Sequence, residues 1–150
     1  MIELCQNQPP RRGANERMSM SGPGAKSGDR VQAVDTHIVM VPSPGGPVPV
    51  ATPCVFDGLL VENLSCSVFI DNSPVAVEGS VALNSVPHAP VGGSFQKPPS
   101  NRATVDTGSG SVLVSNKKAA RDGDRAVTCN DPADAPKGVV LAQGTVFFGD

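Results

Sequence analysis

The chain has no tryptophan and no tyrosine, and phenylalanine occurs only five times in 150 residues. Aromatic side chains usually supply much of the buried volume of a protein core. We therefore do not expect a large apolar core of the kind that stabilises an ordinary globular domain. Small domains with little core are commonly stabilised by disulfides or a bound metal, so cysteine and histidine are the residues of most interest.

Strong net charge is also absent, because 12 Lys and Arg residues oppose 14 Asp and Glu residues and leave a net charge of −2. This balance does not indicate the basic surface of a nucleic-acid-binding protein or a polybasic patch that would bind an anionic membrane. No apolar run reaches the 18 residues of a membrane-spanning helix, and residues 1–8 lack the apolar segment of a secretory signal. We expect a protein made in the cytoplasm that is carried out of the cell by something else.

Helix signals are scarce, whereas turn-forming residues are abundant. Glycine occurs 16 times and proline 15 times, together 31 of 150 residues, and no stretch shows the periodicity of an amphipathic helix. We expect an all-β fold with long irregular loops, one of them over residues 42–53, where prolines cannot donate to a sheet. Residues 1–22 are polar and predict an N-terminal arm, and residues 23–150 then form a single domain.

A turn sequence with a glycine near its end occurs three times, and such a repeat decides the architecture. The copies are Pro23-Gly24-Ala25-Lys26-Ser27-Gly28-Asp29, Pro74-Val75-Ala76-Val77-Glu78-Gly79-Ser80 and Lys118-Ala119-Ala120-Arg121-Asp122-Gly123-Asp124. Apolar runs at 67–72 and 111–116 precede the second and third copies, and a similar run at 145–149 has no turn after it. We expect three repeats around one axis, with the last strand completing the first repeat.

Side chains that can bind a metal follow each turn. His37 and His88 each lie eight positions after the last residue of their turn, and Cys129 lies five positions after the third turn. Rotation about one axis would bring these positions together, and two imidazoles with a thiolate suit Zn²⁺. In a protein made in the reducing cytosol we expect thiols that bind metal, not disulfides. Cys5 and Cys66 lie outside these positions and are expected to be ordinary thiols.

The turn motifs, together with the strand sequences Ser-Val-Phe-Ile, Ser-Val-Leu-Val and Thr-Val-Phe-Phe, resemble those of PAAR-repeat proteins. The resemblance covers residues 23–150, although no copy has all four letters of the motif. It implies a small conical spike of three β repeats, with a metal held near its tip by histidine and cysteine. Zinc is the metal that the family usually binds, and iron is the alternative.

The resemblance also implies a fourth metal ligand. One branch of the family has Pro-His-Pro-Phe-x-Gly in the long loop after the first ligand, where this chain has Pro53-Cys54-Val55-Phe56-Asp57-Gly58. Cys54 would then replace a family histidine, and both groups suit zinc. The implied ligand set is His37, Cys54, His88 and Cys129.

PAAR-repeat proteins cap the spike of contractile injection systems, which include type VI secretion systems and phage-tail-like extracellular systems. The resemblance therefore implies a structural protein that caps and sharpens a homotrimeric spike of the valine-glycine-repeat type. Its contact with a target membrane would be transient piercing, and any effector cargo would be bound to it and not fused. The expected location is the tip of the particle, which is expelled to the extracellular space or into a target cell.

Two other functions stand beside this one. The first is an independent zinc-binding module or carrier, a monomer with exchangeable metal and no spike partner. The second is an enzyme, which we do not expect, because a fourth ligand closes the zinc to water. In addition, neither a His-x-Glu nor a His-Glu-x-x-His frame is present to supply a general base, and no Walker-type phosphate loop occurs.

Overall fold

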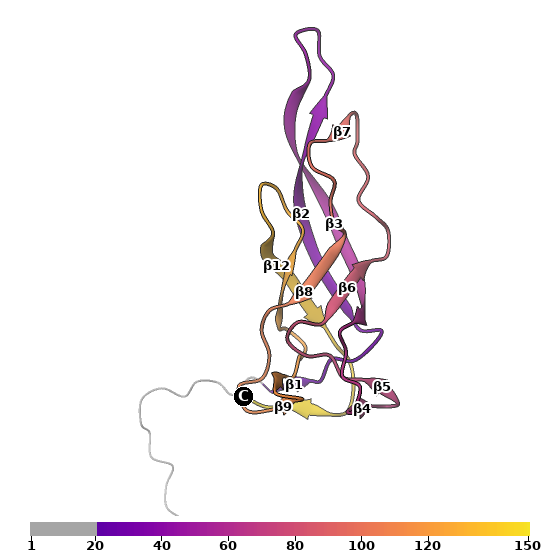
Figure 1. Ribbon diagram of the computed structural model, residues 1–150, viewed down its shortest axis with the longest axis vertical. Helices are drawn as coiled ribbons and strands as arrows, with labels where there is room; N and C mark the ends of the chain where they lie inside the picture. Colours follow the sequence, from indigo (N-terminus) through magenta and orange to yellow (C-terminus); the bar gives the residue numbers. More distant parts are fainter. Residues whose placement is uncertain (1–20) are drawn as a thin grey trace, which may run out of the picture.

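The computed structural model describes residues 21–150, and these contain no helix. They form an elongated all-β body that narrows to a single hairpin at one end (Figure 1). The strands are β1 (Gly22–Pro23), β2 (Arg30–Val41), β3 (Val48–Glu62), β4 (Phe69–Ile70), β5 (Ser73–Pro74), β6 (Val81–Asn84), β7 (Ser94–Phe95), β8 (Arg102–Val105), β9 (Leu113–Val114), β10 (Lys117–Lys118), β11 (Arg125–Thr128), β12 (Ala135–Leu141) and β13 (Phe147–Phe148). The expected all-β conical fold is confirmed.

Six strands close into a small barrel. Their order is β12-β11-β8-β6-β3-β2, and β2 pairs back with β12 to complete the ring. The hairpin of β2 and β3 is paired from Arg30 and Leu59 at its base to Val41 and Val48 at its far end. Its outer half projects beyond the other barrel strands as the narrow end of the molecule (Figure 1). β7 pairs there with the open edge of β2.

The barrel interior is filled mainly by alanine and valine, because alternate residues of each strand point inward and the space between the strands is narrow. Phe56 and Leu60 on β3 are its largest fully buried apolar side chains. Aromatic rings have little room in so small an interior. The scarcity of aromatic residues in the sequence is therefore matched by the size of the core.

The three turns meet around one axis. Their central alanines, Ala25, Ala76 and Ala120, are completely buried and form a closed ring of backbone hydrogen bonds. The N–H of Ala25 donates to the carbonyl of Ala120 (2.9 Å), that of Ala76 to Ala25 (2.8 Å) and that of Ala120 to Ala76 (3.0 Å). This ring shows that the three sequence copies are equivalent and that alanine occupies the axis in each of them.

The last residue of each turn accepts a hydrogen bond from the backbone of the residue three positions before it. These bonds are Lys26 N–H to Asp29 Oδ2 (2.9 Å), Val77 N–H to Ser80 Oγ (2.9 Å) and Arg121 N–H to Asp124 Oδ2 (2.7 Å). In the first and third turns the same acid also pairs with the basic side chain. The second turn has Val77 in place of the basic residue, so there is no cation for an acid to pair with, and the hydroxyl of Ser80 is sufficient to accept the backbone hydrogen bond.

Three short hairpins surround the wide end of the molecule. Two are true hairpins, β4 with β5 and β9 with β10, and the third is the equivalent antiparallel pairing of β13 with β1, which we also call a hairpin although no turn joins its strands. The third joins the two ends of the described chain, so the last strand completes the first repeat, as expected. Ile70, Val114 and Phe148 occupy equivalent positions in the three hairpins and are buried together in a second small core.

The loop expected over residues 42–53 is shorter than predicted. Only residues 42–47 form a turn, and β3 begins at Val48, so Pro49 and Pro53 lie within a strand. They face Met40 and Thr36 across the hairpin. The neighbouring position Ile38 donates its N–H to Asp131 and accepts from Gln96, both on the side away from β3. Alternate residues of an antiparallel pair behave alike, so the backbone groups of Thr36, Ile38 and Met40, and those of their partners on β3, point away from the other strand. Pro49 and Pro53 are among these partners, and proline is tolerated where the amide would face an open edge.

Of the expected arm, residues 1–22, the structure describes only Ser21 and Gly22, and Gly22 pairs with Phe148. The rest of the arm lies outside the described residues. Within residues 21–150 no helix is long and apolar enough to cross a membrane.

Candidate metal centre

Three of the four side chains predicted from the sequence come together inside the narrowing part of the molecule. His37 lies on β2, His88 in the loop after β6, and Cys129 directly after β11. Pro87 and Pro90 restrict the backbone around His88, whose N–H donates to the side-chain oxygen of Asn101 (2.8 Å). The repeat positions thus converge, as the spacing after each turn predicts.

The donor atoms of these residues lie at distances that one metal ion would bridge. His37 Nε2 and His88 Nδ1 face each other at 3.0 Å, and Cys129 Sγ is 3.9 Å from His37 Nε2. With Asp35 they form a group whose ligand atoms all lie within 4.8 Å of one another. Three members of this group are buried, so water competes poorly for the donors. The group could bind a metal ion.

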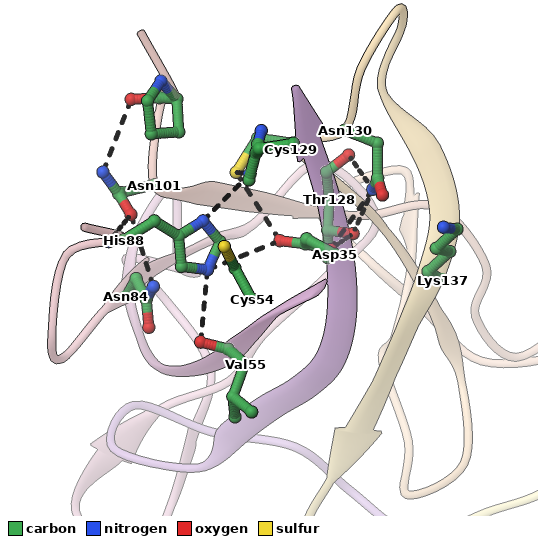
Figure 2. A network of polar contacts seen from close by, with 12 residues as sticks. Asp35, Cys54, Val55, Asn84, His88, Asn101, Thr128, Cys129, Asn130 and Lys137 are labelled. Atoms are coloured by element: carbon green, nitrogen blue, oxygen red, sulfur yellow. Dashed lines mark hydrogen bonds and ion pairs between the residues drawn. The ribbon is translucent and has the colours of Figure 1, made fainter. Parts of the chain in front are cut away.

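Asp35 is the member that sequence reasoning missed. It is completely buried on β2, two residues before His37, and strand alternation therefore places both side chains on the same face. Its carboxylate accepts hydrogen bonds from Thr128 Oγ1 (2.5 Å) and Asn130 Nδ2 (3.2 Å), and it lies 3.6 Å from Cys129 Sγ (Figure 2). The Asp-Thr-His sequence on a predicted strand was the signal that would have found it.

The second ring nitrogen of each histidine, the one not facing the other ring, has polar neighbours of its own, and His88 Nε2 is also 3.9 Å from Asp35 Oδ2. His88 Nε2 lies 3.1 Å from the carbonyl of Val55, to which it can donate a hydrogen bond (Figure 2). His37 Nδ1 is 3.4 Å from Asp131 Oδ2 but is not aligned for a hydrogen bond, and it is a buried nitrogen without a hydrogen-bond partner among the described residues. Metal-bound histidines typically donate their second N–H to a carbonyl or carboxylate. His88 matches this pattern through Val55, whereas His37 has a carboxylate nearby without a hydrogen bond to it.

Burial sets the protonation of the donors. It lowers the pKa of His88, against an opposing effect of the Asp35 charge, so the neutral imidazole that binds metals is favoured. Burial also raises the pKa of the Cys129 thiol, and the Asp35 charge adds to this. The metal-free thiol is therefore protonated at neutral pH, and a metal ion would displace that proton on binding.

Cys54, the fourth predicted ligand, lies beside this group but is not a member of it. It faces Asp35 directly across the β2–β3 hairpin, and Figure 2 shows its sulfur next to the ring of His88. Burial and the Asp35 charge raise the pKa of its thiol. Cys54 is therefore placed where it could complete the metal coordination, and its role as a ligand stays a prediction.

A groove opens beside the group, between residues 53–57 of β3 and residues 84–89 at the end of β6 and in the loop after it. It has a volume of about 450 Å³ and is lined by Cys54, His88 and the residues next to them. A metal ion that binds the group would have access to His88 from this groove. A second, smaller pocket of about 120 Å³ borders His37 and Cys129, so the buried donors are flanked by pockets on two sides.

No protein-family model matches the chain, and no curated protein is similar to it in sequence. The family resemblance consequently rests on the motifs themselves, and the function has to be inferred from the geometry.

Proposed function

We propose that this protein is the structural tip of a contractile injection system, a PAAR-repeat cap for a homotrimeric spike of the valine-glycine-repeat type. The observation that carries the proposal is the three-fold arrangement of a single chain. Three equivalent turns are linked by the alanine ring, and three equivalent hairpins surround the wide end. A monomer with this pseudo-symmetry presents the same contact three times, which is what a three-fold spike end requires.

The hairpins also expose apolar side chains at equivalent positions. Phe69, Leu113 and Phe147 are each more than half exposed, and each directly precedes a buried residue of its strand. Large apolar side chains repeated in this way favour a role in association. In a spike complex they would pack against the three chain ends, whose open strand edges are prone to pairing.

The metal centre supports the same function by stiffening the narrow end. We propose zinc as the ion, because two imidazoles and at least one thiolate match its preferred ligands. The donors come from three segments that are far apart in the sequence, so one ion would connect parts of the cone that share little apolar core. A fourth ligand from Asp35 or Cys54 completes the coordination and leaves zinc in a structural and not a catalytic role.

The proposal is tested by binding to the spike trimer. Purified protein is mixed with the spike trimer of the same injection system, and complex formation is followed by size-exclusion chromatography with light scattering. One cap per trimer is expected, and Phe147→Asp is expected to abolish it. Val34→Asp is the matched control, because Val34 is as exposed as Phe147 but lies on β2, away from the hairpins. Absence of a complex with the wild-type chain would refute the proposal.

A second candidate is a metal carrier, and the groove beside Cys54 and His88 is the observation that favours it. A carrier exchanges its metal rapidly and needs no trimeric partner. Exchange is measured by mixing the zinc-loaded protein with isotopically labelled zinc. Exchange within seconds together with no spike binding would favour the carrier, whereas slow exchange and a one-to-one complex with the trimer favour the cap.

A further inference from the structure

The segment that follows β11 is fastened to the outer edge of β2 on both sides of His37. The N–H of Asp131 donates to the carbonyl of Thr36 (2.9 Å), and the N–H of Thr36 donates to Asn130 Oδ1 (2.8 Å). Two residues further along β2, the N–H of Ile38 donates to Asp131 Oδ2 (2.8 Å). Backbone groups at a strand edge that would otherwise be unpaired are satisfied in this way. His37 lies between these contacts, so its place along the strand is fixed.

The carboxylate of Asp131 has a second neighbour, the ring of His37. The same oxygen, Oδ2, lies 3.4 Å from His37 Nδ1, and the two side chains are only 5% and 1% exposed. The ring nitrogen is buried and has no hydrogen-bond partner among the described residues. A hydrogen bond of ordinary length requires the two atoms to approach by about 0.5 Å. A pocket of about 120 Å³ borders both residues, so the side chains have room for this adjustment.

The number of ring protons explains why this contact is incomplete. A neutral imidazole carries one ring proton, so His37 and His88 have two between them. Three contacts each require one. The first joins His88 Nε2 to the carbonyl of Val55 (3.1 Å), and the second joins the two rings, His37 Nε2 to His88 Nδ1 (3.0 Å). When both are made, His37 carries its proton on Nε2, and its Nδ1 turns a lone pair toward Asp131.

Metal binding by the two rings removes this conflict. A nitrogen binds a metal through its lone pair, so neither His37 Nε2 nor His88 Nδ1 carries a proton in the bound state. The proton of His37 is then on Nδ1, where the carboxylate of Asp131 can accept it in a hydrogen bond. His88 keeps its proton on Nε2 and its contact with Val55. The polar groups around both rings are therefore satisfied together only when the facing nitrogens bind a metal.

We propose that Asp131 is a positioning residue of the metal centre. Its carboxylate accepts the Nδ1 hydrogen of His37 and thereby fixes Nε2 as the nitrogen that binds the metal. A hydrogen bond of this kind orients the ring and makes it a stronger ligand. Asp131 acts through His37, because it is not a member of the group of converging donors. The inference rests on the proposed metal centre and is independent of binding to a spike.

The test compares the zinc affinity of the full chain and its Asp131→Asn variant, by competition with a chromophoric chelator. The amide oxygen of the variant can still accept the Ile38 N–H, but it has no charge and is a weaker acceptor for His37. The Kd for zinc is expected to rise about tenfold or more. The Ile38 amide of the zinc-loaded variant is expected to remain protected from hydrogen exchange. Asp131→Ala removes both contacts, so it should weaken zinc binding further and expose this amide to exchange.

Asp134→Asn is the matched control. Asp134 borders the same pocket and is exposed, so its substitution removes the same charge close to His37 without removing the contact with Nδ1. Its Kd for zinc is expected to stay within about twofold of the wild-type value, because exposed charges have small effects.

Nitrogen-15 spectra of the zinc-loaded protein report the tautomer directly. The chain has two histidines, so two rings account for all the imidazole signals. His37 is expected to be protonated at Nδ1 and to bind zinc through Nε2. In Asp131→Asn the Nδ1 proton is expected to exchange faster with water. A role for Asp131 that is confined to holding the strand edge would change neither signal.

The proposal is overturned by any of four results. The first is a zinc Kd for Asp131→Asn within about twofold of the wild-type value, which would leave Asp131 only its contact with the Ile38 amide. The second is an equal loss of affinity in Asp134→Asn, which would indicate a general effect of negative charge. The third is zinc bound through His37 Nδ1. The fourth is a wild-type chain that binds no zinc, which would also overturn the metal centre, whereas a failed spike-binding experiment would leave the role of Asp131 unaffected.

Discussion

Loss of the metal should destabilise the protein strongly, because the ion would tie together segments that are distant in the sequence. His37 and His88 are 51 residues apart, and Cys129 follows His88 after a further 41 residues. If each tie restricts the unfolded chain as a disulfide closing a loop of that length does, each contributes about 4 kcal/mol. Together they approach the ~10 kcal/mol associated with structural zinc sites.

The perturbation is His88→Ala, which removes one tie and leaves His37 and Cys129. The expected loss of about 4 kcal/mol corresponds to a fall in melting temperature of about 8–16 °C, at ~2–4 °C per kcal/mol for a chain of this size. Removal of the ion from the wild-type protein by a chelator is expected to lower the melting temperature further. Cys66→Ala is the control, because Cys66 is an exposed thiol outside the centre.

Differential scanning calorimetry and elemental analysis on the same samples give the result. One metal ion per wild-type chain, a reduced content in His88→Ala and an unchanged content in Cys66→Ala are expected. A stabilising role is refuted if the wild-type protein binds one ion and loses it to the chelator with a change in melting temperature below about 2 °C, which corresponds to less than about 1 kcal/mol. The ion would then be bound without stabilising the fold. A purified protein that binds no zinc would overturn the centre itself.

Three further predictions concern the turns and the fourth ligand. Gly123→Ala should lower the unfolding free energy by about 1–2 kcal/mol, because the φ of 84° at this residue is a left-handed conformation. The control is Gly110→Ala, at an open position without positive φ. It should lower the unfolding free energy by less than about 0.5 kcal/mol, the usual range for surface substitutions. Ala76→Val should lower the unfolding free energy by about 1–3 kcal/mol, since it adds two methyl groups at a completely buried position of the ring of alanines; an unchanged urea midpoint would contradict this. In the cobalt-substituted protein, Cys54→Ala should remove part of the thiolate-to-metal absorption, and an unchanged spectrum would assign the fourth position to Asp35.

Local sequence patterns determined the repeat and most of its consequences. Two features of each turn depend on contacts within seven residues: a glycine at positive φ and a side chain that accepts a backbone hydrogen bond. These are short-range requirements, so Gly28, Gly79 and Gly123 mark the turns in the amino-acid sequence itself. The closure of the chain by β13 could also be predicted, because the sequence before the first turn, Arg17-Met18-Ser19-Met20, is a poor strand candidate and the last apolar run has no turn after it.

The proline-rich segment shows where local patterns were insufficient. Pro49 and Pro53 break a strand only if their missing amides were needed for pairing, and that depends on which edge of β3 has a neighbour. β3 has β2 on one side, whereas on the other side it is paired with β6 only from Gly58 onward. The prolines therefore lie on an unpaired edge, and the strand continues through them.

The sequence by itself determined the three-fold plan of the molecule and the convergence of His37, His88 and Cys129, three members of the candidate metal centre, because similar spacing after equivalent turns leads to one place. Only the tertiary structure decided that Asp35 joins them and that Cys54 lies at the side. Those two residues face each other across a hairpin, and their distance from the centre depends on how far each side chain reaches from the backbone. Such distances are set by barrel closure and by the hydrogen bonds of Thr128 and Asn130 to Asp35. The partners in these two bonds are separated by 93 and 95 positions in the sequence, so no local sequence pattern predicts the contacts.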